Sequence, residues 1–133
     1  MNISHRVRRK FRRLFHLKLF NALPVKFAWS AYGVWLRKYP QDATYRFCIT
    51  GTYGWYLSDI LQRQASEVFL DIGANQGLYS LIAKKNKAFT SIYAFEPNPK
   101  TYRYLEQNIA RNGGKHVSAF PVGLSDKSAK MAA

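Results

Sequence analysis

Two acidic residues and two glycines of this chain have the spacing of a ligand site. The stretch "VFLDIGANQGLYSLIA" (68–83) runs from apolar residues into Asp71, and Gly73 and Gly77 follow in a short turn. Glu96 comes 25 residues after Asp71. The glycines permit a tight turn and a close approach of backbone N–H groups to a ligand. We therefore expect a small ligand to be recognised by two carboxylates beside a turn.

The same residues favour S-adenosylmethionine over a dinucleotide. A dinucleotide turn reads G-x-G-x-x-G, but Asn75 stands at the second glycine position, and Asp71 would repel a pyrophosphate. A carboxylate there attracts a cation such as the ammonium of an amino acid. Glu96, at the end of the next strand, can accept hydrogen bonds from both hydroxyls of a ribose. An amino acid joined to a nucleoside is S-adenosylmethionine, which is the cofactor that we predict.

The elements expected around these residues alternate regularly between strand and helix. Strands are predicted over 67–71, 91–95 and 117–122, and helices over 77–86 and 98–113. The last helix has the clearest start, because Asn98 is an N-cap residue and Pro99 suits the first helical position. This order predicts an α/β fold with a partial Rossmann-like sheet of parallel strands and flanking helices. Ligands of such sheets bind beyond the carboxyl ends of the strands.

The first third of the chain has a different character. Residues 5–23 form a predicted basic amphipathic helix that ends at Pro24, and residues 26–38 a second, aromatic-rich helical stretch. A strand is expected over 44–49. A helix is expected over 55–64, with three residues facing inward: Leu57, Ile60 and Leu61. We therefore divide the chain into a basic helical extension (1–40) and an incomplete Rossmann-like domain (41–133).

The charge of the chain belongs mainly to its beginning. The 133 residues carry a net charge of +14 and are 47% hydrophobic, which suits a packed domain. Residues 1–41 hold ten Lys and Arg and no acid. A basic amphipathic helix over 5–23 can contact an anionic membrane surface or, as the weaker option, the phosphates of a nucleic acid.

Cysteine and histidine usage excludes several kinds of site. Cys48 is the only cysteine, so no internal disulfide is possible, and we expect a cytoplasmic protein, with peripheral contact at the inner membrane surface through 5–23. The three histidines are scattered and have no metal-ligand spacing, so no metal site is expected. The apolar run 27–36 is shorter than the roughly 20 residues that span a bilayer.

Three motifs in order resemble the FkbM family of S-adenosylmethionine-dependent methyltransferases. They are "FLDIGANQGLYSL", "YAFEPNPKTYRYLEQNIARNG" and "VSAFPVGLSDKS", which together cover about 67–128. Asn75 in D-I-G-A-N-x-G, E-P-N-P after the second strand and L-S-D after the third are typical of that family. The resemblance implies methylation of a hydroxyl oxygen on a sugar or another natural product.

The resemblance also implies roles for individual residues. Asp71 would hold the methionine ammonium, directly or through a water molecule, and Glu96 would bind the ribose hydroxyls. The turn residues that would line the carboxylate end of the cofactor are Gly73, Ala74, Asn75 and Gly77. The residues that would surround the adenine are Pro97, Asn98, Leu124, Ser125 and Asp126. The resemblance assigns no catalytic residue.

Members of the FkbM family continue through further strands, which this sequence does not include. We therefore expect the cofactor half of a truncated methyltransferase, with the acceptor half absent and an open sheet edge at "VFLD". The expected partners are a small-molecule or glycan hydroxyl acceptor and a second polypeptide that completes the sheet. The alternative is a non-catalytic binding module that uses the basic helix on a degenerate scaffold, which would have no need for Asp71 together with Glu96.

Overall fold

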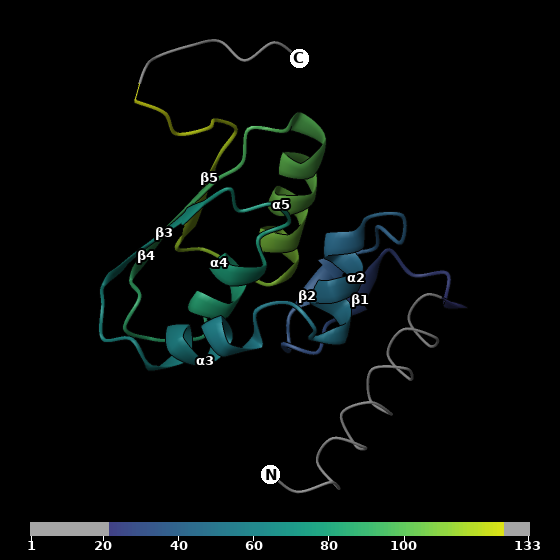
Figure 1. Cartoon of the computed structure of the whole chain (residues 1–133), viewed down its shortest axis with the longest axis horizontal. Coiled ribbons are helices and arrows are strands. Elements are labelled where there is room, and N and C mark those ends of the chain that lie inside the picture. The colour runs from purple at the N-terminus through teal and green to yellow at the C-terminus, as the bar shows by residue number, and fades with distance from the viewer. Residues whose placement is uncertain (1–21, 127–133) are drawn as a thin grey trace, which may run out of the picture.

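A hairpin and two helices precede a run of alternating strands and helices (Figure 1). The computed structural model describes residues 22–126. In chain order the elements are β1 (Phe27–Trp29), β2 (Trp35–Arg37), α2 (Ala43–Thr50), α3 (Trp55–Arg63), β3 (Val68–Ile72), α4 (Leu78–Ala83), β4 (Ser91–Phe95), α5 (Pro99–Arg111) and β5 (Val117–Phe120). The helix predicted over 5–23 lies almost wholly outside the described residues, so it stays a prediction. Among the described residues, no helix combines the length and the apolar composition that crossing a membrane requires.

The predicted parallel sheet is confirmed. Its order is β3-β4-β5, and both pairs are parallel, with Asp71 of β3 beside Ala94 of β4. Figure 1 shows α4 and α5 on one side of this sheet. The N-cap prediction for α5 is also confirmed, because Asn98 Oδ1 accepts hydrogen bonds from the backbone N–H groups of Lys100 and Thr101.

The other face of the sheet is uncovered among residues 22–126. On β3 the side chains of Val68, Leu70 and Ile72 are 50%, 55% and 63% exposed. Beside them, Phe95 of β4 stacks on Phe120 of β5 with ring centroids 5.2 Å apart. Within the described chain β3 pairs with β4 alone, so its outer edge is open, as the sequence predicted.

The helix predicted over 26–38 is wrong, because this segment forms a hairpin. β1 and β2 pair antiparallel, with Phe27 opposite Arg37 and Trp29 opposite Trp35. Gly33 lies in the connecting turn at a φ of +68°, a conformation that glycine adopts without steric cost. A continuous helix would also have to bury aromatic side chains on all sides, whereas the hairpin puts Ala28 and Leu36 in the core.

The strand predicted over 44–49 is also wrong, because these residues belong to helix α2. Asp42 provides the N-cap, since its Oδ1 accepts a hydrogen bond from Tyr45 N at 2.6 Å. Gly51 ends the helix in the left-handed conformation. The buried residues Tyr45, Cys48 and Ile49 have the spacing of one helix face.

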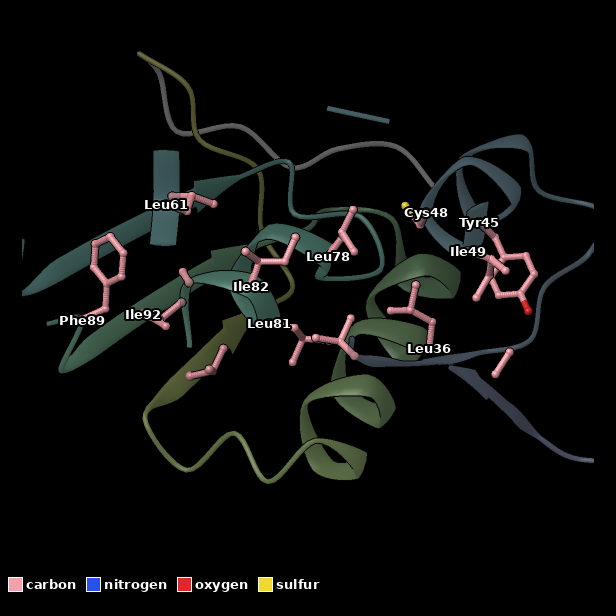
Figure 2. Packing of buried hydrophobic residues seen from close by; sticks show 14 residues of the cluster. Leu36, Tyr45, Cys48, Ile49, Leu61, Leu78, Leu81, Ile82, Phe89 and Ile92 are labelled. Atoms are coloured by element: carbon pink, nitrogen blue, oxygen red, sulfur yellow. The ribbon is translucent and has the colours of Figure 1, made fainter. Parts of the chain in front are cut away.

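One core joins the hairpin, the helices and the sheet (Figure 2). Leu36 of β2 and Ile49 of α2 belong to the same cluster as Leu81 of α4 and Ile92 of β4. The helix predicted over 55–64 is confirmed as α3, and Leu61 is buried as expected. Ile60 is exposed, so its predicted inward position is wrong. The boundary placed at residue 40 stays a prediction.

Candidate functional site

The turn between β3 and α4 has a backbone that needs glycine. Gly73, Asn75 and Gly77 all have positive φ angles, at +75°, +51° and +83°. At Gly77 an added Cβ would lie 2.5 Å from Leu105 Cδ1, so the fully buried Leu105 side chain would have to shift, in addition to the conformational strain. At Gly73 an added Cβ would meet nothing within 4 Å, and only the conformation favours glycine.

The turn is held in this shape by its own hydrogen bonds. The N–H groups of Gly73 and Ala74 both donate to Phe95 O at 2.9 Å, which fixes the turn to the end of β4. The N–H group of Gln76 donates to Asn75 Oδ1, and that of Gly77 to Ala74 O, both at 2.8 Å. All of these bonds lie within the protein, so a ligand would meet a preorganised turn.

Asp71 is buried at the end of the covered face of β3, and it caps the next helix. Its Oδ2 accepts hydrogen bonds from Ser80 N at 3.0 Å and from Ser80 Oγ at 2.5 Å. Gly77, the N-cap residue of α4, has no side chain that could do this. Within residues 22–126 Asp71 Oδ1 has no hydrogen-bond partner, so this oxygen can accept from a ligand.

The charge of Asp71 has an energetic cost. Burial raises the pKa of this carboxyl above its ordinary value, the two bonds from Ser80 lower it in part, and the negative charge of Glu96 raises it further. Desolvation disfavours the ionised form of a buried acid unless a positive group compensates. A cation beside Oδ1 would supply that compensation.

Glu96 joins the two turns that follow β3 and β4. Its Oε2 accepts a hydrogen bond from Asn75 N and its Oε1 one from Asn98 N, each at 2.9 Å. The side chain is buried. An ionised carboxylate has about four acceptor positions, so Glu96 can bind both turns and still accept from a diol.

The other predicted residues lie near the same edge or beyond it. Pro97 is half-buried, and Asn98 uses its side chain as the N-cap of α5. The remaining predicted adenine contacts lie on an exposed segment after β5, and they are Leu124, Ser125 and Asp126. Ser125 Oγ donates to Asp126 Oδ1 at 3.1 Å. Parallel strands have their carboxyl ends on the same side of the sheet. The segment 124–126 therefore follows β5 on the side where Glu96 follows β4.

Sequence reasoning missed three polar residues around the turn. Ser80 could have been found as the partner of Asp71, because a glycine N-cap offers no side-chain acceptor to the N–H group of the third helical residue, and that residue is Ser80. Gln76 gave no signal, although it is only 3% exposed and its Oε1 is buried without a hydrogen-bond partner among the described residues. Asn108 of α5 donates from Nδ2 to Gln76 O at 2.9 Å, a contact between residues 32 positions apart.

The chain matches no model of a known protein family. It is 36% identical over 74 residues to Methyltransferase sdnD of Sordaria araneosa, which covers 55% of this chain and 29% of that protein. It is 32% identical over 63 residues to Methyltransferase 1 of Beauveria bassiana, which covers 47% of this chain and 25% of that protein. The chain thus spans less than a third of the length of these curated relatives.

Solved structures show the same fold. The structure of aTrm5 in complex with tRNALeu has a TM-score of 0.55 at 16% identity, over 91% of this chain and 43% of that one. M. jannaschii TYW2 in complex with AdoMet has a TM-score of 0.53 at 21% identity, over 70% of this chain and 41% of that one. At these identities the likeness concerns the fold alone. The chain shares a Rossmann-like α/β fold with these two structures.

Proposed function

We propose that this chain is the cofactor-binding part of an S-adenosylmethionine-dependent methyltransferase. Two curated proteins that are named methyltransferases support this proposal, at 36% and 32% identity over roughly half of the chain. The fold supports it independently, since a parallel sheet of this type binds ligands at the carboxyl ends of its strands. The resemblance to the FkbM family stays a prediction.

One observation carries the proposal: two buried carboxylates lie at the ends of adjacent parallel strands, and both retain acceptor capacity. Asp71 Oδ1 has no partner among the described residues, and Glu96 uses one acceptor position on each oxygen. Asp71 Oδ1 reaches the molecular surface, since it is not one of the buried unpaired atoms of residues 22–126, and a ligand can therefore contact it. An ammonium at Asp71 and a ribose diol at Glu96 would satisfy both residues.

The residues fit S-adenosylmethionine at each of its ends. Asp71 would bind the ammonium, and the backbone of 73–77 would line the methionine carboxylate. Glu96 would bind the ribose hydroxyls. Pro97 and Asn98 would flank the adenine, and the segment 124–126 would contact its edge. When bound, the cofactor supplies an electrophilic methyl group, and the task of the protein is to hold that group in line with the acceptor.

For the acceptor we propose a hydroxyl group on a sugar or another natural product. The motifs D-I-G-A-N-x-G, E-P-N-P and L-S-D support this choice through the resemblance to the FkbM family. Because the chain spans less than a third of its curated relatives, we propose that the residues that bind the acceptor belong to the part of the protein that this chain does not span.

The test is calorimetric titration of S-adenosylmethionine into the wild-type chain and into Glu96→Ala. We expect Glu96→Ala to weaken binding by roughly 1.5 to 3 kcal/mol, as for the loss of hydrogen bonds to a charged group. Glu106→Ala is the matched control, because Glu106 is an exposed carboxylate on α5. Absence of binding by the folded wild-type chain would refute the cofactor role, and equal binding by both variants would refute the assignment of Glu96.

A further inference from the structure

Asn108 is a fully buried amide that connects the turn 73–77, here called the cofactor turn, to the hairpin β1–β2. Its side chain is 0% exposed, and both ends are paired. Oδ1 accepts a hydrogen bond from Arg37 N of β2 at 2.6 Å, and Nδ2 donates to Gln76 O at 2.9 Å. The two partners lie in segments that are distant in sequence and have no hydrogen bond to each other among the described residues. Asn108 is thus a bridge between them.

Asn112, the C-cap residue of α5 and four positions after Asn108, binds the hairpin in the same way. Its Oδ1 accepts from Trp35 N at 2.9 Å and its Nδ2 donates to Trp35 O at 2.7 Å. Nδ2 also donates to Asn108 O within α5. The two asparagines therefore take the place of a neighbouring strand along β2. Within residues 22–126 no hydrogen bond of the Asn112 side chain reaches the turn, so Asn112 is a natural control for Asn108.

Gln76 occupies the part of the turn that most needs support. It lies between Asn75, a non-glycine residue at a φ of +51°, and Gly77 at +83°. Such a backbone persists only where its surroundings hold it. The start of the turn is fixed to Phe95 O, and Glu96 holds Asn75 N. At Gln76 the side chain donates from Nε2 to Asp42 Oδ1 at 3.5 Å, and the backbone carbonyl accepts from Asn108. Loss of the Asn108 bond would release this carbonyl and let the turn relax while β3 and α4 stay folded.

We propose that Asn108 is a positioning residue for the cofactor turn, which it ties to the hairpin β1–β2. This inference rests on the proposed function, since it assumes that the turn binds the cofactor. Its consequence is specific: cofactor affinity depends on Asn108 beyond the contribution of Asn108 to stability. Asn112 contributes to stability through the same hairpin and leaves cofactor affinity unchanged.

The experiment compares Asn108→Ala with Asn112→Ala in the 133-residue chain. Unfolding in urea measures the stability of each variant, and calorimetry measures the Kd for S-adenosylmethionine. We expect both variants to unfold at lower urea concentration, because each removes side-chain hydrogen bonds to the backbone of β2. We expect the Kd to rise about tenfold in Asn108→Ala, equivalent to about 1.4 kcal/mol, and to stay at the wild-type value in Asn112→Ala.

A second variant keeps the inference testable if Asn108→Ala does not fold. Asn108→Asp keeps the acceptor for Arg37 N but places an oxygen opposite Gln76 O. At neutral pH this oxygen cannot donate, and the Kd should rise relative to wild type. Lowering the pH protonates this buried carboxyl, because desolvation disfavours its charged form, and the protonated oxygen can donate to Gln76 O. The Kd of Asn108→Asp divided by the wild-type Kd should therefore fall as the pH is lowered.

The outcomes separate this inference from the proposed function. If the folded wild-type chain does not bind S-adenosylmethionine, the proposed function and the inference both fail. If the wild-type chain binds, and the two alanine variants raise the Kd equally or not at all, only the inference fails. A pH-independent Kd ratio for Asn108→Asp would likewise overturn it.

Discussion

Replacing Asp71 by asparagine should separate two roles of one carboxylate. Oδ2 caps α4 through Ser80, whereas Oδ1 has no partner within residues 22–126. An asparagine in the same orientation keeps an acceptor for Ser80 N and Ser80 Oγ. It replaces the free oxygen with an NH2 group, which repels an ammonium. Asp71→Asn therefore preserves the cap and removes the proposed ligand contact.

The stability of the unliganded protein should respond in the opposite direction from cofactor affinity. Burial raises the pKa of Asp71, so the folded state binds a proton more tightly than the unfolded state does. Between the two pKa values the folded state holds more protons, and the free energy of unfolding falls as the pH rises through this window. Asparagine carries no charge and avoids this loss. We expect Asp71→Asn to be more stable than wild type at neutral pH and equally stable at about pH 3, below the unfolded pKa.

Cofactor affinity should fall in the same variant. A hydrogen bond between charged groups contributes about 1.5 to 3 kcal/mol, so the Kd for S-adenosylmethionine should rise about 10- to 150-fold. Adenosine lacks the amino acid and should bind Asp71→Asn as it binds wild type. Glu96→Ala should weaken the binding of both ligands. Calorimetry with the two ligands and urea unfolding across pH measure these effects.

Ser80→Ala is the matched control for Asp71→Asn. It removes the hydroxyl donor to Oδ2 and leaves the backbone donor and Oδ1 in place. We expect some loss of stability and no loss of affinity for S-adenosylmethionine. The reasoning is refuted if Asp71→Asn binds S-adenosylmethionine as tightly as wild type. It is also refuted if this variant is less stable than wild type at neutral pH.

Two further predictions concern the turn and the core. Gly77→Ala should lower the free energy of unfolding by about 2–4 kcal/mol, and Gly73→Ala by only about 1–2 kcal/mol. The difference is expected because, of these two positions, only at Gly77 would the added Cβ lie 2.5 Å from Leu105 Cδ1. Equal losses in urea unfolding would contradict this packing. Burial raises the pKa of Cys48 to about 12, so a thiol reagent at neutral pH should label this residue only after unfolding. The labelling reaction can be followed by absorbance. Rapid labelling of the native protein would contradict the packing of α2 against the core.

The sequence was most informative where local signals and tertiary structure agree. Asn98 and Pro99 marked the start of α5, and the structure begins this helix at Pro99. The meeting of Asp71 and Glu96 at one edge followed from the parallel order of their strands, which the structure confirms. The binding roles of the two residues stay predictions.

Two elements were missed for different physical reasons. The residues of α2 carry local signals of a helix, with Asp42 as the N-cap and Gly51 at the end, so this helix was predictable. The hairpin was not, because the periodicity of a short apolar run such as 27–36 does not distinguish a strand from a buried helical segment. The hairpin is held by residues that are distant in the sequence. The side chains of Asn108 and Asn112 bind the backbone of β2, which lies more than 70 positions earlier in the chain.

The uncovered face of the sheet has a consequence for how unfolding can be followed. Dyes such as ANS bind exposed apolar surface, and their fluorescence is usually read as a sign of loosened packing. Here the aliphatic side chains of β3 and the stacked rings of Phe95 and Phe120 offer such a surface while the chain is folded. A dye-based melting curve would therefore start bright and change little. Circular dichroism, which reports the helices and the sheet directly, is the suitable probe for this protein.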